Sequence, residues 1–142
     1  MNASKALGLC NCFAVRQAAR QVTRHYERYF AGAQLTSAQF SILVALSEEG
    51  HMTMLDLAKV LVMDRTTLLR AMKPLQREGL LKSAVRDADP RQLLFSLSPA
   101  GERKLKQALP LWAKAQEEFE AGMGPRAAAR LRRTLLALAQ GG

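Results

Sequence analysis

Hydrophobic residues recur at three- and four-residue spacing along most of this chain, which is the period of an amphipathic helix. The first periodic stretch has arginines between its apolar positions and predicts a helix from about residue 9 to residue 31. Thr36 and Gln39 then form a capping-box pattern, in which a hydroxyl and a side-chain amide satisfy backbone groups at the start of a helix. We therefore expect a second helix over residues 37–47, ended by Gly50.

Two further helices are predicted close together. Thr53 opens a short helix that continues through Leu61, and Asp64 is a suitable N-cap for a longer helix that ends near Gly79. Only two residues lie between these helices, which is the spacing of a helix-turn-helix motif. The inner side of the longer helix carries Leu68, Leu69, Met72 and Leu75.

After this motif the pattern becomes strand-like. Residues 80–85 and 92–97 form two runs typical of strands, and the polar segment RDADPR at 86–91 lies between them. This arrangement predicts a two-stranded hairpin with a charged tip.

The last third of the chain returns to a helical pattern. Ser98 followed by Pro99 is the start signal of a long helix, and Pro110 is expected to kink that helix because proline lacks a backbone donor. After a loop at residues 122–125, residues 126–140 form the last predicted helix. The residues expected to be buried along these two helices are Leu105, Leu109, Trp112, Phe119, Leu131, Leu135 and Leu138.

The chain has 142 residues and a formal net charge of +9, with a pI near 10.3. This length suits one domain that spans residues 1–142. A basic balance suggests a polyanionic partner, either nucleic acid or an anionic membrane surface. The total charge does not choose between these partners, so the positions of the charges must decide.

Several classes of protein are disfavoured by the sequence. No apolar run approaches the ~18 residues that span a bilayer, and we expect a cytoplasmic protein without a membrane partner, in which thiols stay reduced. The sequence has no glycine-rich phosphate loop and no nucleophile motif, so we expect neither an enzyme nor a bound cofactor. We also expect no metal site, because His25 and His51 do not form a ligand-spaced cluster with the two cysteines.

The helix that begins at Asp64 carries hydroxyls and cations opposite its apolar residues. In the major groove, arginine reads guanine through two hydrogen bonds, while hydroxyls and backbone N–H groups at a helix start hold phosphates. Pro74 should kink this helix, so the groove-reading part is expected to be residues 65–73. The residues on or beside the outer face are Arg65, Thr66, Thr67, Arg70, Lys73 and Arg77.

An ordinary solvated helix can show the same charge pattern, so the neighbouring elements decide the interpretation. Here the helix follows another at helix-turn-helix spacing and precedes a hairpin, as in a winged variant. Arg86 and Arg91 flank the predicted hairpin tip, where minor-groove or phosphate contact is possible. We therefore predict that double-stranded DNA is the polyanionic partner.

Three motifs resemble the MarR family of bacterial transcription regulators: LTSAQFSILVAL, DRTTLLRAMKPLQREGLL and DADPRQLLFSLSPAGERKL. The third contains a D-x-R wing tip, here Asp89-Pro90-Arg91, followed by a strand and Leu-Ser-Pro-x-Gly. The resemblance covers nearly the whole chain and implies a mostly α winged helix-turn-helix with a small β-hairpin wing. It also assigns Arg91 to minor-groove contact and Asp89 to orienting Arg91.

The resemblance further implies a homodimer whose N- and C-terminal helices intertwine. Residues 36–98 would then form the DNA-binding lobe, and residues 1–32 and 99–142 the dimerisation helices. The first and last helices are more apolar than a small winged-helix core needs, which agrees with a dimer because that surplus must be buried. The implied function is a repressor that binds a palindromic operator; the alternative is a non-specific architectural DNA-binding protein.

Cys10 and Cys12 are the only cysteines in the chain, and they raise the question of a redox signal. The pair Cys12-Phe13 resembles the start of the first helix in the organic-peroxide sensors of this family, the OhrR group. There a tyrosine fourteen residues after the reactive cysteine reaches the thiolate from the partner subunit, and Tyr26 stands at that position here. The resemblance thus implies a sensing role for Cys12.

Two departures from that group leave a second interpretation open. Ser37 and Arg16 occupy positions where those sensors carry tyrosines. Arg16, one helical turn after Cys12, could favour the thiolate, whereas the other interpretation makes Cys12 a small packing residue in the dimer interface. Cys10 has no counterpart in the resemblance, and we expect it to resolve an oxidised Cys12 across the dimer.

A small-molecule effector is a further partner that the resemblance implies. Its pocket would lie between the DNA-binding lobe and the dimerisation helices. The expected lining residues are His25, Tyr26 and Trp112, all of which could equally be plain core residues.

Overall fold

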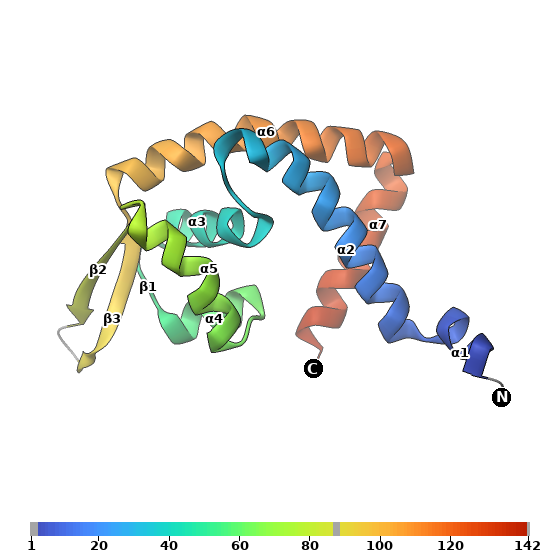
Figure 1. Ribbon diagram of the computed structural model, residues 1–142, viewed down its shortest axis with the longest axis horizontal. Helices are drawn as coiled ribbons and strands as arrows, with labels where there is room; N and C mark the ends of the chain where they lie inside the picture. Colours follow the sequence, from blue (N-terminus) through green and yellow to red (C-terminus); the bar gives the residue numbers. More distant parts are fainter. Residues whose placement is uncertain (1–2, 87–88, 142) are drawn as a thin grey trace.

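The fold is a series of helices with one small antiparallel sheet, and the computed structural model describes residues 3–86 and 89–141. Figure 1 shows α6 as a long bar: the sheet and α3 to α5 lie beneath one end, and α2 and α7 descend from the other. The elements are α1 (Ala3–Leu9), α2 (Asn11–Phe30), η1 (Ala31–Ala33), α3 (Ser37–Glu49), β1 (Met52–Thr53), α4 (Met54–Leu61), α5 (Arg65–Arg77), β2 (Leu81–Arg86), β3 (Asp89–Leu97), α6 (Pro99–Met123) and α7 (Pro125–Gln140).

The core of the lobe beneath α6 forms where α3, α4 and α5 pack together. Thr36 accepts a hydrogen bond from the Gln39 backbone, and the Gln39 side chain accepts one from the Thr36 N–H, which confirms the predicted capping box. Phe30 stacks on Phe40 with ring centroids 4.6 Å apart and joins α2 to this core. The largest fully buried side chains are Phe30, Ile42, Leu43, Leu46, Leu57, Leu68, Met72 and Leu75.

The sheet has three strands in the order β1-β3-β2, so the prediction of two strands was incomplete. β1 is only two residues long and pairs Met52 with Phe95 of β3. β2 pairs with β3 along the hairpin, and the register shifts between Val85 and Arg86. Residues 87–88 of the predicted hairpin tip lie outside the described residues.

The turn between α4 and α5 consists of Val62, Met63 and the N-cap residue Asp64, and it has an unusual backbone. Val62 has φ +52°, in the left-handed region, and its side chain is largely exposed. The turn is closed by hydrogen bonds from Val62 N to Lys59 O and from Met63 N to Ala58 O. A β-branched residue is strained in this conformation, so tertiary structure must hold it there.

The opposite end of the molecule is joined by polar contacts. His25 Nε2 lies 2.8 Å from Ala115 O, and the Arg28 guanidinium donates to His25 Nδ1 at 3.2 Å. Because Arg28 can only donate, Nδ1 is the acceptor and Nε2 carries the hydrogen that Ala115 O accepts. The Tyr29 hydroxyl donates to Glu118, so α2 is attached to α6 through two neighbouring rings.

The predicted first helix is confirmed as α2, and a short helix that was not predicted, α1, precedes it on the other side of Cys10. Cys10 has extended backbone angles, and its Sγ accepts a hydrogen bond from Phe13 N at 3.4 Å, so it acts as the N-cap of α2. The two prolines do not end their helices, since α5 runs continuously through Pro74 and α6 through Pro110. The predicted loop at 122–125 is reduced to Gly124 between α6 and α7.

Several residues predicted to be buried are exposed in the single chain. Leu135 and Leu138 of α7 are 43% and 66% exposed, and Leu109 and Trp112 of α6 are also exposed. The reason is that α7 contacts this chain mainly through α6, so the rest of its apolar face has no partner within one chain. Within residues 3–86 and 89–141, no single helix combines the length and apolar character for crossing a membrane; one bent pair, 11–33 with 37–49, does so by length and composition.

Candidate nucleic-acid interface

The start of α5 is fixed by its cap. Asp64 accepts hydrogen bonds from the Thr67 backbone N–H at 2.8 Å and from the Thr67 hydroxyl at 2.9 Å. These two bonds hold the pKa of Asp64 below its ordinary value. The Thr67 hydroxyl therefore serves the cap, and Thr66 presents the exposed hydroxyl beside the first turn.

The outer face of α5 is a row of exposed cations. Burial of Leu68, Met72 and Leu75 fixes the rotation of the helix, and this turns the opposite side outward. Arg70 and Lys73 lie there beside Arg77, on the rim of a shallow groove of about 520 Å³. None of the three forms an ion pair with any described residue, so their charges are available to a polyanion.

The wing carries a second group of cations on β2 and β3. Arg91 is 92% exposed in its side chain, and its N–H and Nε donate to Asp89 Oδ1 at 3.1 and 3.4 Å. Arg86 donates to Gln92 Oε1 at 2.9 Å across the hairpin. Asp89 thus contacts Arg91, the pair that the family resemblance selects, whereas contact of Arg91 with a minor groove stays a prediction.

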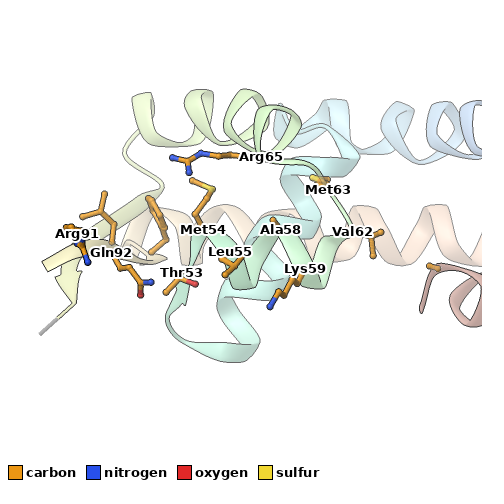
Figure 2. Close-up of a pocket in the computed structure, with 13 residues that line it drawn as sticks. Thr53, Met54, Leu55, Ala58, Lys59, Val62, Met63, Arg65, Arg91 and Gln92 are labelled. Carbon is orange, nitrogen blue, oxygen red and sulfur yellow. The ribbon is translucent and has the colours of Figure 1, made fainter. Parts of the chain in front are cut away.

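A groove of about 850 Å³ connects the start of α5 with the wing (Figure 2). Lys59, Arg65 and Arg91 lie along it, and Figure 2 shows the Arg65 side chain extending over Met54 toward the wing. Among the described residues that line this groove, none is acidic. The groove therefore places Lys59 and Arg65, from α4 and the start of α5, on the same surface as the wing residue Arg91.

Sequence reasoning missed Lys59 and Gln92 as members of this surface. Lys59 lies on α4, which supplies the first helix of the motif, and Gln92 follows the wing-tip arginine in β3. An exposed cation on the first helix of a helix-turn-helix was a usable signal for Lys59. For Gln92 the signal was only its adjacency to Arg91.

The three predicted effector residues are not brought together in one of the main grooves of the single chain, and the effector pocket stays a prediction. His25 is committed to Ala115 and Arg28, and Trp112 lines none of the main grooves. Tyr26 does line an apolar groove of about 560 Å³ between α2, α6 and α7.

The Tyr26 hydroxyl begins a polar network at the floor of that groove. It donates to Gln116, whose amide donates to Glu120 Oε1 at 3.0 Å, and Arg132 contacts the same carboxylate oxygen at 3.3 Å. Burial raises the pKa of Tyr26 above its ordinary value, Glu120 adds to this effect, and Arg132 opposes it. The network ties α2, α6 and α7 together where no described residue covers them.

Both cysteines are exposed, and they are far from the predicted tyrosine within one chain. Fourteen residues of helix separate Cys12 from Tyr26, a rise of about 21 Å along α2. Both lie on nearly the same side of α2, because fourteen helical residues complete almost four turns. Contact between them therefore requires two chains. Among the described residues no His, Cys, Asp and Glu side chains group as they would around a metal ion.

Comparison with known proteins shows which family this fold belongs to. The model of the MarR family matches residues 35–93, which include the helix-turn-helix and part of the wing. The transcriptional regulator MosR of M. tuberculosis, solved in complex with DNA, is 36% identical, with 93% of this chain and 95% of that chain covered and a TM-score of 0.83. The chain belongs to the MarR family.

Two other relatives show how widely the MarR-family fold is shared. CouR, a transcriptional repressor solved bound to a 23-mer DNA duplex, is 23% identical, with a TM-score of 0.86 and 99% of each chain covered. The organic hydroperoxide resistance transcriptional regulator of Bacillus subtilis is 25% identical over 100 residues, which are 70% of this chain and 68% of that relative. These MarR-family relatives are transcription regulators and not enzymes, as the sequence predicted.

Proposed function

We propose that this MarR-family chain is a repressor that binds a palindromic operator as a homodimer and releases it after a chemical signal. Two observations carry the proposal: the exposed cations Arg70, Lys73 and Arg77 of α5 form no ion pair with any described residue, and a groove with Lys59, Arg65 and Arg91 along it runs from the start of α5 to the wing. Arg70 would read bases in the major groove, and Arg91 would enter the adjacent minor groove. Arg65, Thr66 and Lys73 would hold phosphates between these two contacts, while Thr67 supports the helix start and Arg86 flanks the wing.

The dimer is proposed from the surfaces that one chain leaves uncovered. The groove between α2, α6 and α7 is lined by small and branched apolar residues, and Leu135 and Leu136 at its edge are exposed. A second copy related by a two-fold axis would cover this groove with the same residues. Residues 1–32 and 99–142 would then be the dimerisation helices, and 36–98 the DNA-binding lobe.

For the signal we propose oxidation of Cys12. If two α2 helices cross antiparallel at Ala19, midway between Cys12 and Tyr26, the thiol of one chain meets the Tyr26 hydroxyl of the other. An organic hydroperoxide would oxidise the Cys12 thiolate to a sulfenic acid and leave as an alcohol. In this crossing Cys10 of the partner subunit would lie about 24 Å from Cys12 along the helices, too far for a disulfide, so a small thiol would form a mixed disulfide with Cys12 and release water. Added polar bulk in the interface would move the two lobes and lower DNA affinity, and Arg16 would favour the reactive thiolate.

Operator binding before and after treatment with cumene hydroperoxide tests the signal. We expect weaker binding by the treated wild type and by treated Cys10→Ser, and unchanged binding by Cys12→Ser. If the treated wild type binds normally although its thiols are oxidised, Cys12 is a packing residue. The signal would then be a small ligand, for which the groove beside Tyr26 is the available site.

Selection of bound duplexes from random DNA tests the proposed function as a whole. Two identical half-sites, centred about one helical turn or roughly 34 Å apart, are the expected result. Transcription in vitro from a promoter carrying the recovered sequence should fall when the protein is added. Recovery of no preferred sequence would instead identify a non-specific architectural protein.

A further inference from the structure

A hydrogen-bonded joint connects the end of the recognition helix α5 to the start of α6. Leu80 N donates to Leu75 O at 2.9 Å, which turns the chain back onto α5. Ser98 N donates to Leu80 O at 3.0 Å, and the Ser98 hydroxyl donates to Gly79 O at 2.6 Å. The same hydroxyl accepts from Gly101 N at 3.0 Å and so caps α6. One buried side chain therefore holds both helix ends.

The backbone segments that meet at this joint are too closely packed to shift against each other. Gly101 lies so close to the strand that an added Cβ would be 2.1 Å from Leu80 O, a backbone atom that cannot move aside independently. Leu80, Ser98 and Gly101 are buried, so water is excluded from the hydrogen bonds among these three residues, whereas the bond to Gly79 O is only partly buried. The first turn of α6 is consequently fixed in both distance and angle against the end of α5.

Because this joint lies at the start of the long helix α6, a small change of angle at the joint would displace the far end of the helix by a large distance. α6 has 25 residues, which corresponds to about 37 Å of helix, and its far end carries α2 and α7 (Figure 1). A change of about 5° at the joint would therefore move the far end of α6 by about 3 Å, which is close to the rise of one base pair. The lobe has further attachments to these helices: α3 packs on α6, which is less directional than hydrogen bonding, and Ser37 N at the start of α3 donates to Glu27 Oε1 of α2 at 3.0 Å.

We infer that Ser98 and Gly101 are positioning residues that set the half-site spacing the regulator accepts. The inference rests on the proposed function, since it needs a dimer on a palindromic operator. Neither residue touches DNA in this account; both act by fixing α5 relative to the dimerisation helices. The wild-type protein should consequently accept one spacing sharply and reject neighbours that differ by one base pair.

A spacer series built on the selected palindrome tests this inference. Affinities are measured for the optimal duplex and for duplexes one and two base pairs shorter or longer. For wild type, one base pair should cost about tenfold in affinity, the loss expected when about one bidentate base contact is broken. For Ser98→Ala the same change should cost less than about threefold, while preference among bases within a half-site stays as in wild type.

Matched variants separate positioning from folding. Ser98→Thr keeps the hydroxyl and should restore the sharp spacing profile. Thr36→Ala removes the comparable cap of α3 but leaves the joint intact, so its profile should stay sharp even though it is destabilised. Ser98→Gly replaces Ser98→Ala if the alanine variant does not fold, because glycine is tolerated at an N-cap.

The outcomes distinguish the inference from the proposed function. The inference would be overturned, and the proposed function left standing, if Ser98→Ala depended on half-site spacing as sharply as wild type does. The same holds if Thr36→Ala also weakened the dependence of affinity on spacing. Altered base preference within one half-site would also overturn it, because Ser98 would then serve the fold of the lobe. A wild-type protein indifferent to spacing would refute the palindrome-binding dimer itself.

Discussion

Arg70 occupies the centre of the outer face of α5, exposed and without an acidic partner among the described residues. Arg70→Ala should weaken binding to the selected operator by about 1–3 kcal/mol, because a bidentate contact to guanine is lost. Anisotropy titrations on operator and random duplexes measure this, with Arg126→Ala on α7 as an exposed control. Equal losses on both duplexes would reassign Arg70 to phosphate binding.

Asp64 links pH to stability through its cap. Its hydrogen bonds with Thr67 lower the pKa of Asp64 in the folded state. The ionised carboxylate therefore stabilises the folded protein above the unfolded-state pKa of about 3.9, and this stabilisation is lost as the pH falls through the lower folded-state pKa. Asp64→Asn keeps an acceptor but cannot titrate. Below about pH 4, the melting temperature of wild type should therefore fall more steeply than that of the variant. Parallel pH profiles would show that the cap bonds do not depend on the charge.

The roles of single residues were predictable from the sequence where they depend only on residues nearby in the chain. Thr36, Asp64 and Ser98 cap their helices as expected, because a cap depends on a few residues in sequence. The effector pocket of His25, Tyr26 and Trp112 stays a prediction, because it depends on how α2 and α6 are rotated against each other and on a second chain. Sequence periodicity gives the apolar side of a helix, but it does not give the neighbour that the side meets.

At the scale of elements, the α4–α5 turn stores strain at Val62. Val62→Gly should raise the free energy of unfolding by up to about 1 kcal/mol, since relief of the left-handed conformation outweighs the entropy of glycine in the unfolded chain. Val60→Gly is the matched control, an equally exposed valine inside α4, and should lower stability by about 1 kcal/mol. Urea denaturation measures both; destabilisation by both variants to the same extent would show that Val62 is unstrained.

The same scale explains which elements were missed. β1 has two residues, and its only signal is pairing with β3 more than forty positions away, which periodicity does not contain. The break between α1 and α2 arises at Cys10, a residue that is not a usual N-cap. Helix α5 was predicted correctly because its pattern is amphipathic and begins at a capping residue, whereas the two wing strands extend further into the predicted tip than expected, to Arg86 and from Asp89.

At the scale of the whole molecule, the uncovered faces of α2 and α7 predict the assembly. Leu135→Glu would place a charge in the groove that a second copy should cover, so dimer affinity should fall at least about tenfold. Sedimentation equilibrium measures this, with Val60→Glu as an exposed control on α4. An unchanged dimer, or a wild-type monomer at micromolar concentration, would place the interface elsewhere or remove it.

The ratio of affinities for specific and non-specific DNA tests the proposed regulator most directly. It is measured with the selected operator and a scrambled duplex of the same length and composition, at one physiological salt concentration. A sequence-reading dimer predicts that the operator binds at least about a thousandfold more tightly. A ratio near one would contradict the account, because the cations of α5 and the wing would then bind only the phosphate backbone.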